Sequence, residues 1–172
     1  MKSIPLQESE VQSLLQDGKA TLRRVVKPQP PEDWGGPIAV EFYHPAIDGK
    51  DGMMRDGPEI FGAYSEDWGV ACPFGGPGQR LLVREACTIV EDRNTPCQDS
   101  MFWATVKYKA DGLVRHEMVV QEAWRESFAP PGNGYRTSTQ MPVWASRLTI
   151  EIVSVRVEQA EAWEWVIGVK LV

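Results

Sequence analysis

Three short phrases of the chain carry side chains that could bind or transform a polar ligand. Residues 18–28 read GKATLRRVVKP, residues 75–85 read GGPGQRLLVRE, and residues 141–147 read MPVWASR. Each phrase places cationic side chains beside a turn or a short strand. Guanidinium groups offer a rigid fork of donors that suits phosphate oxygens and base edges. The three phrases therefore predict a polar cleft that holds an anionic or base-like ligand.

Lys19, Thr21 and Glu85 are the candidate catalytic residues. An amide-hydrolysis site needs a nucleophile, a base and a partner for the oxyanion, and Thr21 supplies a hydroxyl close to Lys19 in sequence. Lys19 could give up its proton readily if it packs beside the arginines that follow it, because like charges disfavour protonation. Glu85 could be the base or could orient Lys19. The alternative is an ion pair of Glu85 with Lys19 or Arg84 and no catalysis.

A second group of residues could bind the ligand without chemistry. The arginines of the three phrases could grip phosphate or a base edge, and their alternative role is salt bridging around the mouth of a barrel. Trp144 could stack on a base, whereas its alternative role is to seal a core between strand and loop. The candidate ligand-binding residues are Arg23, Arg24, Arg84, Trp144, Ser146 and Arg147.

The overall charge limits the kind of nucleic-acid binding that the chain could perform. With 18 Lys and Arg against 24 Asp and Glu, the formal net charge is −6. Proteins that coat nucleic acid nonspecifically use broad Lys/Arg surfaces, so that class is disfavoured. A local basic pocket on an acidic body stays open, since Lys19, Arg23, Arg24 and Lys27 fall within one short stretch.

Length and cysteine usage favour a plain globular protein. The 172 residues, 42% of them hydrophobic, suit a single domain spanning residues 1–172. The three cysteines form no CxxC and the two histidines are isolated, so no metal and no cofactor are expected. Reduced cysteines suit a cytoplasmic protein. We expect neither a signal peptide nor a membrane span, because no apolar run of suitable length occurs.

Local patterns predict one helix among many strands. Residues 8–17 place Val11, Leu14 and Leu15 on one face, and Gly18 suits a left-handed C-terminal position. A surface loop is expected at residues 44–58, and residues 129–134, with two prolines and two glycines, are expected as a second loop. The expected strands cover residues 21–27, 38–43, 80–90, 102–108, 113–120, 148–157 and 163–171. Residues 110–112, Ala-Asp-Gly, predict a hairpin turn between the strands at 102–108 and 113–120.

The strand pattern also suggests how the sheet closes. After Ile152 the apolar phase shifts by one residue to Val153, as a β-bulge would produce, and bulges bend a sheet toward closure. The predicted fold class is therefore α+β, mainly β: a small, partly closed β-barrel with long loops.

The three phrases resemble the ASCH domain family of the PUA-like superfamily, most closely the ASCH proteins of phages and prophages. Those proteins carry a helix ending in Gly-x-Lys-Thr-x-Thr-Arg-Arg, where this chain has GKATLRR from residue 18. They also carry Cys-Pro-Tyr-Gly-x-Pro-Gly-Asp-Arg-Leu-Trp-Val-Arg-Glu, where residues 72–85 read CPFGGPGQRLLVRE. Their Arg-Pro-Ser-x-x-Met-Pro-Arg-Trp-Ala-Ser-Arg is similar to RTSTQMPVWASR at residues 136–147. The likeness covers residues 11–172.

The resemblance implies a small β-barrel with short flanking helices and a role related to nucleic acids. PUA-like barrels often bind RNA or modified bases, and some ASCH members deacetylate N4-acetylcytidine nucleosides or cleave RNA. In the hydrolases a Lys, a Thr three residues later and a Glu from a later strand work together, which implicates Lys19 and Glu85. The position of that Thr is Leu22 here, and Thr21 stands one residue early. A one-residue offset in a strand normally turns a side chain to the other face.

Three functions follow from these observations. The first is a cytoplasmic, phage- or prophage-type ASCH protein that binds RNA, a nucleotide or a modified nucleoside. The second is an amidohydrolase that acts on N4-acylated cytidine nucleosides through Lys19, Thr21 and Glu85. The third is a phage accessory protein that binds another protein and uses the barrel only as a scaffold.

Overall fold

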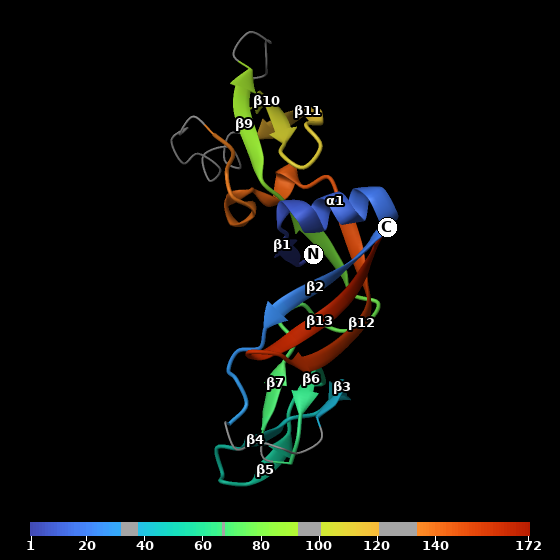
Figure 1. Cartoon of the computed structure of the whole chain (residues 1–172). Helices are drawn as coiled ribbons and strands as arrows, with labels where there is room; N and C mark the ends of the chain where they lie inside the picture. Colours follow the sequence, from blue (N-terminus) through green and yellow to red (C-terminus); the bar gives the residue numbers. More distant parts are fainter. Residues whose placement is uncertain (32–37, 67, 93–100, 121–133) are drawn as a thin grey trace. The chain divides into compact units, whose positions relative to one another are not determined.

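A computed structural model describes residues 1–31, 38–66, 68–92, 101–120 and 134–172 (Figure 1). The helical elements are α1 (Glu8–Asp17) and the short 3-10 helices η1 (Ser138–Gln140) and η2 (Val143–Ala145). The strands are β1 (Ser3–Pro5), β2 (Lys19–Val25), β3 (Ala39–Tyr43), β4 (Ala46–Asp48), β5 (Met54–Asp56), β6 (Ile60–Tyr64), β7 (Gly69–Ala71), β8 (Arg80–Arg84), β9 (Cys87–Asp92), β10 (Met101–Tyr108), β11 (Val114–Val120), β12 (Thr149–Gln159) and β13 (Trp163–Leu171). The α+β, mainly β class predicted from the sequence is confirmed.

The described strands form four open sheets. Their orders are β1-β8-β12-β13-β2, β11-β10-β9, β3-β6-β7 and β4-β5. A barrel requires the first and last strands of a sheet to pair, and in the described residues β1 and β2 end the largest sheet without pairing to each other. The predicted small β-barrel is therefore not what these residues form. Among the described helices, none has the length and apolar content that a membrane crossing requires.

The chain divides into two compact units. Unit 1 comprises residues 1–19, 81–150 and 171–172, and unit 2 comprises residues 20–80 and 151–170. The division falls inside β2, β8, β12 and β13 rather than at linkers. The single domain over residues 1–172 thus stays a prediction.

Unit 1 contains α1 and the antiparallel sheet β9-β10-β11. The helix buries Val11 and Leu14 and ends at Gly18, whose φ of 69° is the left-handed conformation that glycine adopts without strain. The amide of Gly18 donates to the carbonyl of Leu14 at 3.0 Å. Both the helix and its terminator are as the sequence predicts. The parallel pairing of β1 with β8 was not predicted, because a three-residue strand has no readable periodicity.

The strand expected at residues 80–90 is interrupted. β8 ends at Arg84 and β9 begins at Cys87, so Glu85 and Ala86 lie in a break between two sheets. β10 and β11 form the expected hairpin, in which the amide of Gly112 (φ 72°) donates to the carbonyl of Tyr108 at 2.9 Å. The break after β8 and this turn provide two of the three segments that build the site described below.

Unit 2 contains the sheets β3-β6-β7 and β4-β5. Residues 44–58, expected as a loop, instead form the hairpin of β4 with β5, in which Ala46 pairs with Asp56 and Asp48 with Met54. All six residues of these strands are exposed, so the hairpin buries no apolar face and its sequence shows no alternating pattern. In β12, Val155 and Val157 are half-buried and follow the predicted change of phase, whereas Val153, where that phase was expected to begin, is exposed. The loop expected at residues 129–134 lies largely outside the described residues.

Candidate functional site

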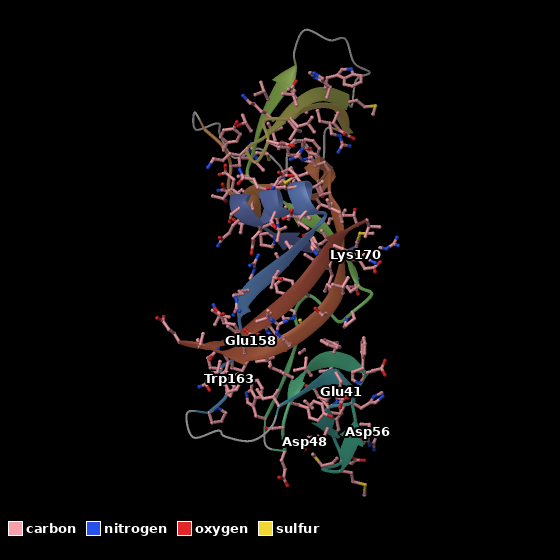
Figure 2. The ribbon with its side chains drawn as sticks, turned by 45° about the vertical axis from the view of Figure 1, so that its right-hand side comes forward. Glu41, Asp48, Asp56, Glu158, Trp163 and Lys170 are labelled. Carbon is pink, nitrogen blue, oxygen red and sulfur yellow. The ribbon has the colours of Figure 1, made fainter. Side chains whose placement is uncertain are left out.

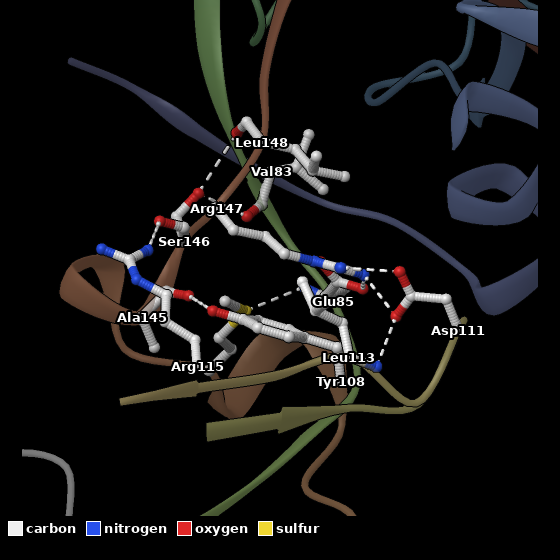
Figure 3. A network of polar contacts seen from close by, with 11 residues as sticks. Val83, Glu85, Tyr108, Asp111, Leu113, Arg115, Ala145, Ser146, Arg147 and Leu148 are labelled. Carbon is white, nitrogen blue, oxygen red and sulfur yellow. Dashed lines mark hydrogen bonds and ion pairs between the residues drawn. The ribbon is translucent and has the colours of Figure 1, made fainter. Parts of the chain in front are cut away.

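A buried guanidinium between two carboxylates is the centre of the candidate site in unit 1 (Figure 3). Nε and Nη2 of Arg147 donate to the two oxygens of Glu85 at 2.9 and 3.0 Å. Nη1 and Nη2 also donate to the two oxygens of Asp111 at 2.7 and 3.0 Å. The side chains of Arg147 and Glu85 are only 8% and 2% exposed, whereas that of Asp111 is 34% exposed. The guanidinium therefore has an inner, dry carboxylate and an outer carboxylate at the solvent boundary.

Pairing of the chain around β8 positions Glu85 and Arg147 against each other. The amide of Val83 donates to the carbonyl of Leu148 at 2.9 Å, and Ser146 Oγ donates to the carbonyl of Val83 at 2.8 Å. These bonds hold residues 146–148 alongside the end of β8, so that Arg147 faces the break that carries Glu85. Two phrases more than sixty positions apart in sequence meet here.

Tyr108 covers one face of the guanidinium. Cζ of Arg147 lies 4.1 Å from the centroid of its ring, a cation–π geometry. The hydroxyl of Tyr108 donates to the carbonyl of Ala145 at 2.7 Å, which fixes the ring. Burial raises the pKa of Tyr108, although the nearby charge of Arg115 opposes the shift. Tyr108 is thus a neutral hydrogen-bond donor, and its bond to the carbonyl of Ala145 fixes both its own ring and the segment before Arg147.

The charges of the site stabilise one another. Burial by itself lowers the pKa of Arg147, but the hydrogen bonds that it donates to Glu85 and Asp111 outweigh this effect and the pKa is raised. The hydrogen bond from Arg147 holds the pKa of Asp111 below its ordinary 3.8, and the backbone amide of Leu113 adds to this effect. Both groups are therefore ionised at neutral pH, and the arginine cannot act as an acid.

Arg84 does not join this cluster. Its Nε donates to the carbonyl of Met141 at 2.8 Å and its Nη2 to the carbonyl of Thr139. The alternative raised from the sequence was an ion pair of Glu85 with Lys19 or Arg84. Glu85 is indeed ion-paired, but its partner is Arg147. Neighbours along an extended chain point in opposite directions, which separates Arg84 from Glu85. The amide of Glu85 lies 3.0 Å from Sδ of Met141, a weak acceptor.

The other candidate catalytic residues lie on β2. Lys19 and Thr21 are exposed on one face of the strand and Leu22, which stands at the family's Thr position, is fully buried on the other. Within the described residues no hydrogen bond or ion pair joins Lys19 to Glu85. The carboxylate oxygens of Glu85 are instead both occupied by Arg147. The structure thus brings together Glu85 and Arg147, and it does not join Lys19 to them.

The remaining candidate ligand-binding residues have contacts within their own units. Arg23, half-exposed on β2, binds Glu158 at 2.8 Å and Glu164 at 3.1 Å. Nη1 of Arg24 donates to the carbonyl of Arg23 at 2.7 Å. Trp144 is partly buried against the cluster formed by Cys87, Val106, Tyr108, Met141 and Ala145, which is the core-sealing role. Figure 2 shows Glu158 near the end of β12, the middle strand of the large sheet.

Two residues of the site were missed from the sequence. Asp111 was assigned only to a hairpin turn, and Tyr108 only to a strand. No local signal distinguishes a turn aspartate that binds an arginine 36 positions away from one that merely caps a turn. In the described part of the chain no three His, Cys, Asp or Glu side chains gather as a metal ion would need.

Comparison of the chain with protein-family models, with curated proteins and with solved structures found no match. The chemistry of the site is therefore argued from its geometry. The outer edge of the Arg147 guanidinium, which here donates to Asp111, has the geometry to bind a planar or tetrahedral anion in bidentate fashion. A buried carboxylate whose two oxygens each accept from a guanidinium is a poor general base, because the guanidinium blocks the approach of a substrate proton.

Proposed function

We propose that this chain is an ASCH-like, PUA-like protein of the phage or prophage type that binds a nucleotide, RNA or a modified nucleoside in the cytoplasm. The observation that carries the proposal is the pairing of Glu85 with Arg147. It unites the second and third phrases that resemble the family, and it holds a guanidinium in a rigid position behind the partly exposed Asp111. The same pairing supports binding rather than catalysis.

Asp111 stands where the ligand's anionic group would bind. Its carboxylate takes two donors on the outer edge of Arg147, at 2.7 and 3.0 Å, and it is the more exposed of the two carboxylates. A phosphate offers the same bidentate acceptor geometry with more charge. Binding would exchange Asp111 for phosphate while Glu85 keeps the guanidinium in place. A hydrogen-bonded guanidinium loses little side-chain freedom when the ligand arrives.

Titration with cytidine monophosphate, cytidine and a short RNA tests the proposal. We expect the phosphate-bearing ligands to bind more tightly than cytidine. Asp111→Asn should tighten nucleotide binding severalfold, because the competing negative charge is removed while the turn is kept. Asp48→Asn is the matched control, since it removes an exposed carboxylate from β4 in unit 2 and should have no such effect.

Two outcomes would reject this function. The first is that neither the wild-type protein nor Asp111→Asn binds any of the three ligands at millimolar concentration. The second is that Asp48→Asn changes binding as much as Asp111→Asn does. Incubation with N4-acetylcytidine, with chromatographic detection of cytidine, addresses the amidohydrolase alternative. We expect no turnover above the blank, because Glu85 is occupied by Arg147.

A further inference from the structure

Unit 2 contains a hollow that the proposed function does not use. It is a hollow open to solvent with a volume of about 520 Å³, within the size range of small-molecule sites. It lies among the end of β3, the end of β6 and the start of β7. The lining residues with polar or aromatic side chains are Tyr43, His44, Tyr64, Ser65, Glu66 and Trp68.

Aromatic rings dominate the lining of this hollow. The rings of Tyr43 and Tyr64 lie with centroids 4.4 Å apart at an interplanar angle of 33°. The hydroxyl of Tyr64 donates to Oε1 of Glu41 at 2.6 Å, which holds that ring in place. Trp68 sits in the hairpin between β6 and β7, where the amide of Ser65 donates to its carbonyl at 2.7 Å. The faces of such rings are negative and attract cations.

The polar groups of the hollow are the Glu66 carboxylate, the His44 ring and the hydroxyl and indole groups of Tyr43, Tyr64, Ser65 and Trp68. Nδ1 of His44 lies 3.0 Å from the carbonyl of Gly57. Because a carbonyl can only accept, Nδ1 carries a proton and is the donor in this contact. Glu66 adds an exposed carboxylate. Among the described residues, none that lines the hollow is Lys or Arg.

The surrounding segment is strongly acidic. Between residues 38 and 69 the sequence has seven Asp and Glu against two Lys and Arg, a formal charge of −5 out of −6 for the whole chain. Glu41, Asp48 and Asp56 are exposed on β3, β4 and β5 of this unit (Figure 2). Such a field attracts cations and repels phosphate groups.

We propose that this hollow binds a small organic cation of the alkylated ammonium class. The methyl groups and charge of the ligand would contact the rings of Tyr43, Tyr64 and Trp68, and Glu66 would supply the counter-charge. The ring faces, the Glu66 carboxylate and the acidic surround all select for positive charge. This site is independent of the nucleotide function proposed for unit 1.

Choline and its neutral carbon isostere, in which a tert-butyl group replaces trimethylammonium, test this site. The two ligands have the same shape and differ in charge, so cation recognition predicts at least about tenfold tighter binding of choline. Trp68→Leu should weaken choline binding about tenfold. Phe42→Leu is the matched control, since Phe42 is an exposed aromatic residue on β3 that does not line the hollow.

Isothermal titration and circular dichroism of each variant give the readouts. Choline binding in the wild-type protein, lost with Trp68→Leu and kept with Phe42→Leu at unchanged circular dichroism, supports the site. Equal affinity for the neutral isostere overturns it, since the hollow would then be merely apolar. So does a lack of choline binding at millimolar concentration, or equal weakening in the two variants.

Discussion

Replacing Arg147 by methionine should destabilise the protein far more than an ordinary loss of an ion pair. Methionine keeps much of the apolar stem, so the change is mainly the loss of charge and of four N–H donors. Glu85, whose side chain is 2% exposed, would be left charged and without its partner. Removing one member of a buried pair costs roughly 3–5 kcal/mol, largely from the stranded charge. This is a large part of the roughly 5–15 kcal/mol that stabilises a typical domain.

The matched control is Arg23→Met in unit 2. Arg23 also binds two carboxylates, those of Glu158 and Glu164, but its side chain is 50% exposed. Water can solvate the two glutamates once the arginine is gone, so the loss should be small. The two variants therefore differ in burial and hardly at all in the number of carboxylate partners.

Urea unfolding followed by tryptophan fluorescence and by circular dichroism measures both losses, provided that the two signals coincide. The double variant Glu85→Leu/Arg147→Met removes both charges of the buried pair and should be more stable than Arg147→Met alone. Equal losses for Arg147→Met and Arg23→Met would refute the reasoning. So would a double variant that is less stable than the single one.

Two further predictions concern titratable groups of unit 1. The pKa of Asp111 is below 3.8 in the folded protein, so its contribution to stability is fully present above that pH and is lost as the pH falls through the lowered value. The difference in unfolding free energy between wild type and Asp111→Asn should therefore shrink below pH 3.8. A difference that does not depend on pH would contradict this. Burial raises the pKa of Cys87 from 9.0 to about 11, so iodoacetamide at mildly alkaline pH should leave Cys87 unlabelled in the native protein and label it in urea. Peptide mapping checks this, and labelling of Cys87 at equal rates in both states would disprove it.

The helix and most of the strands could be predicted because their signals are local. Val11 and Leu14 lie one helical turn apart, so the buried face of α1 is readable from spacing alone. Gly18 ends the helix because of its own backbone freedom, which the residue type alone predicts. Strand β10 and its turn at Gly112 follow in the same way from alternation and turn chemistry.

Other elements could not be predicted, because their stability comes from elsewhere in the chain. The hairpin of β4 with β5 has no buried face, so its exposed polar residues look like a loop. The arrangement of the sheets, open in the described residues rather than closed as a barrel, depends on which strands pair. Strand pairing is a long-range choice that residue patterns constrain only weakly.

For the candidate site, residue types alone were enough to mark Glu85 and Arg147 as important. A carboxylate and a guanidinium next to predicted strands need partners wherever they are buried. Their pairing with each other, the addition of Asp111 and the separation of Lys19 from them emerged only from the folded chain. Composition and spacing act over a few residues, whereas these contacts bridge 36 and 62 positions and exist only once the backbone between them has packed.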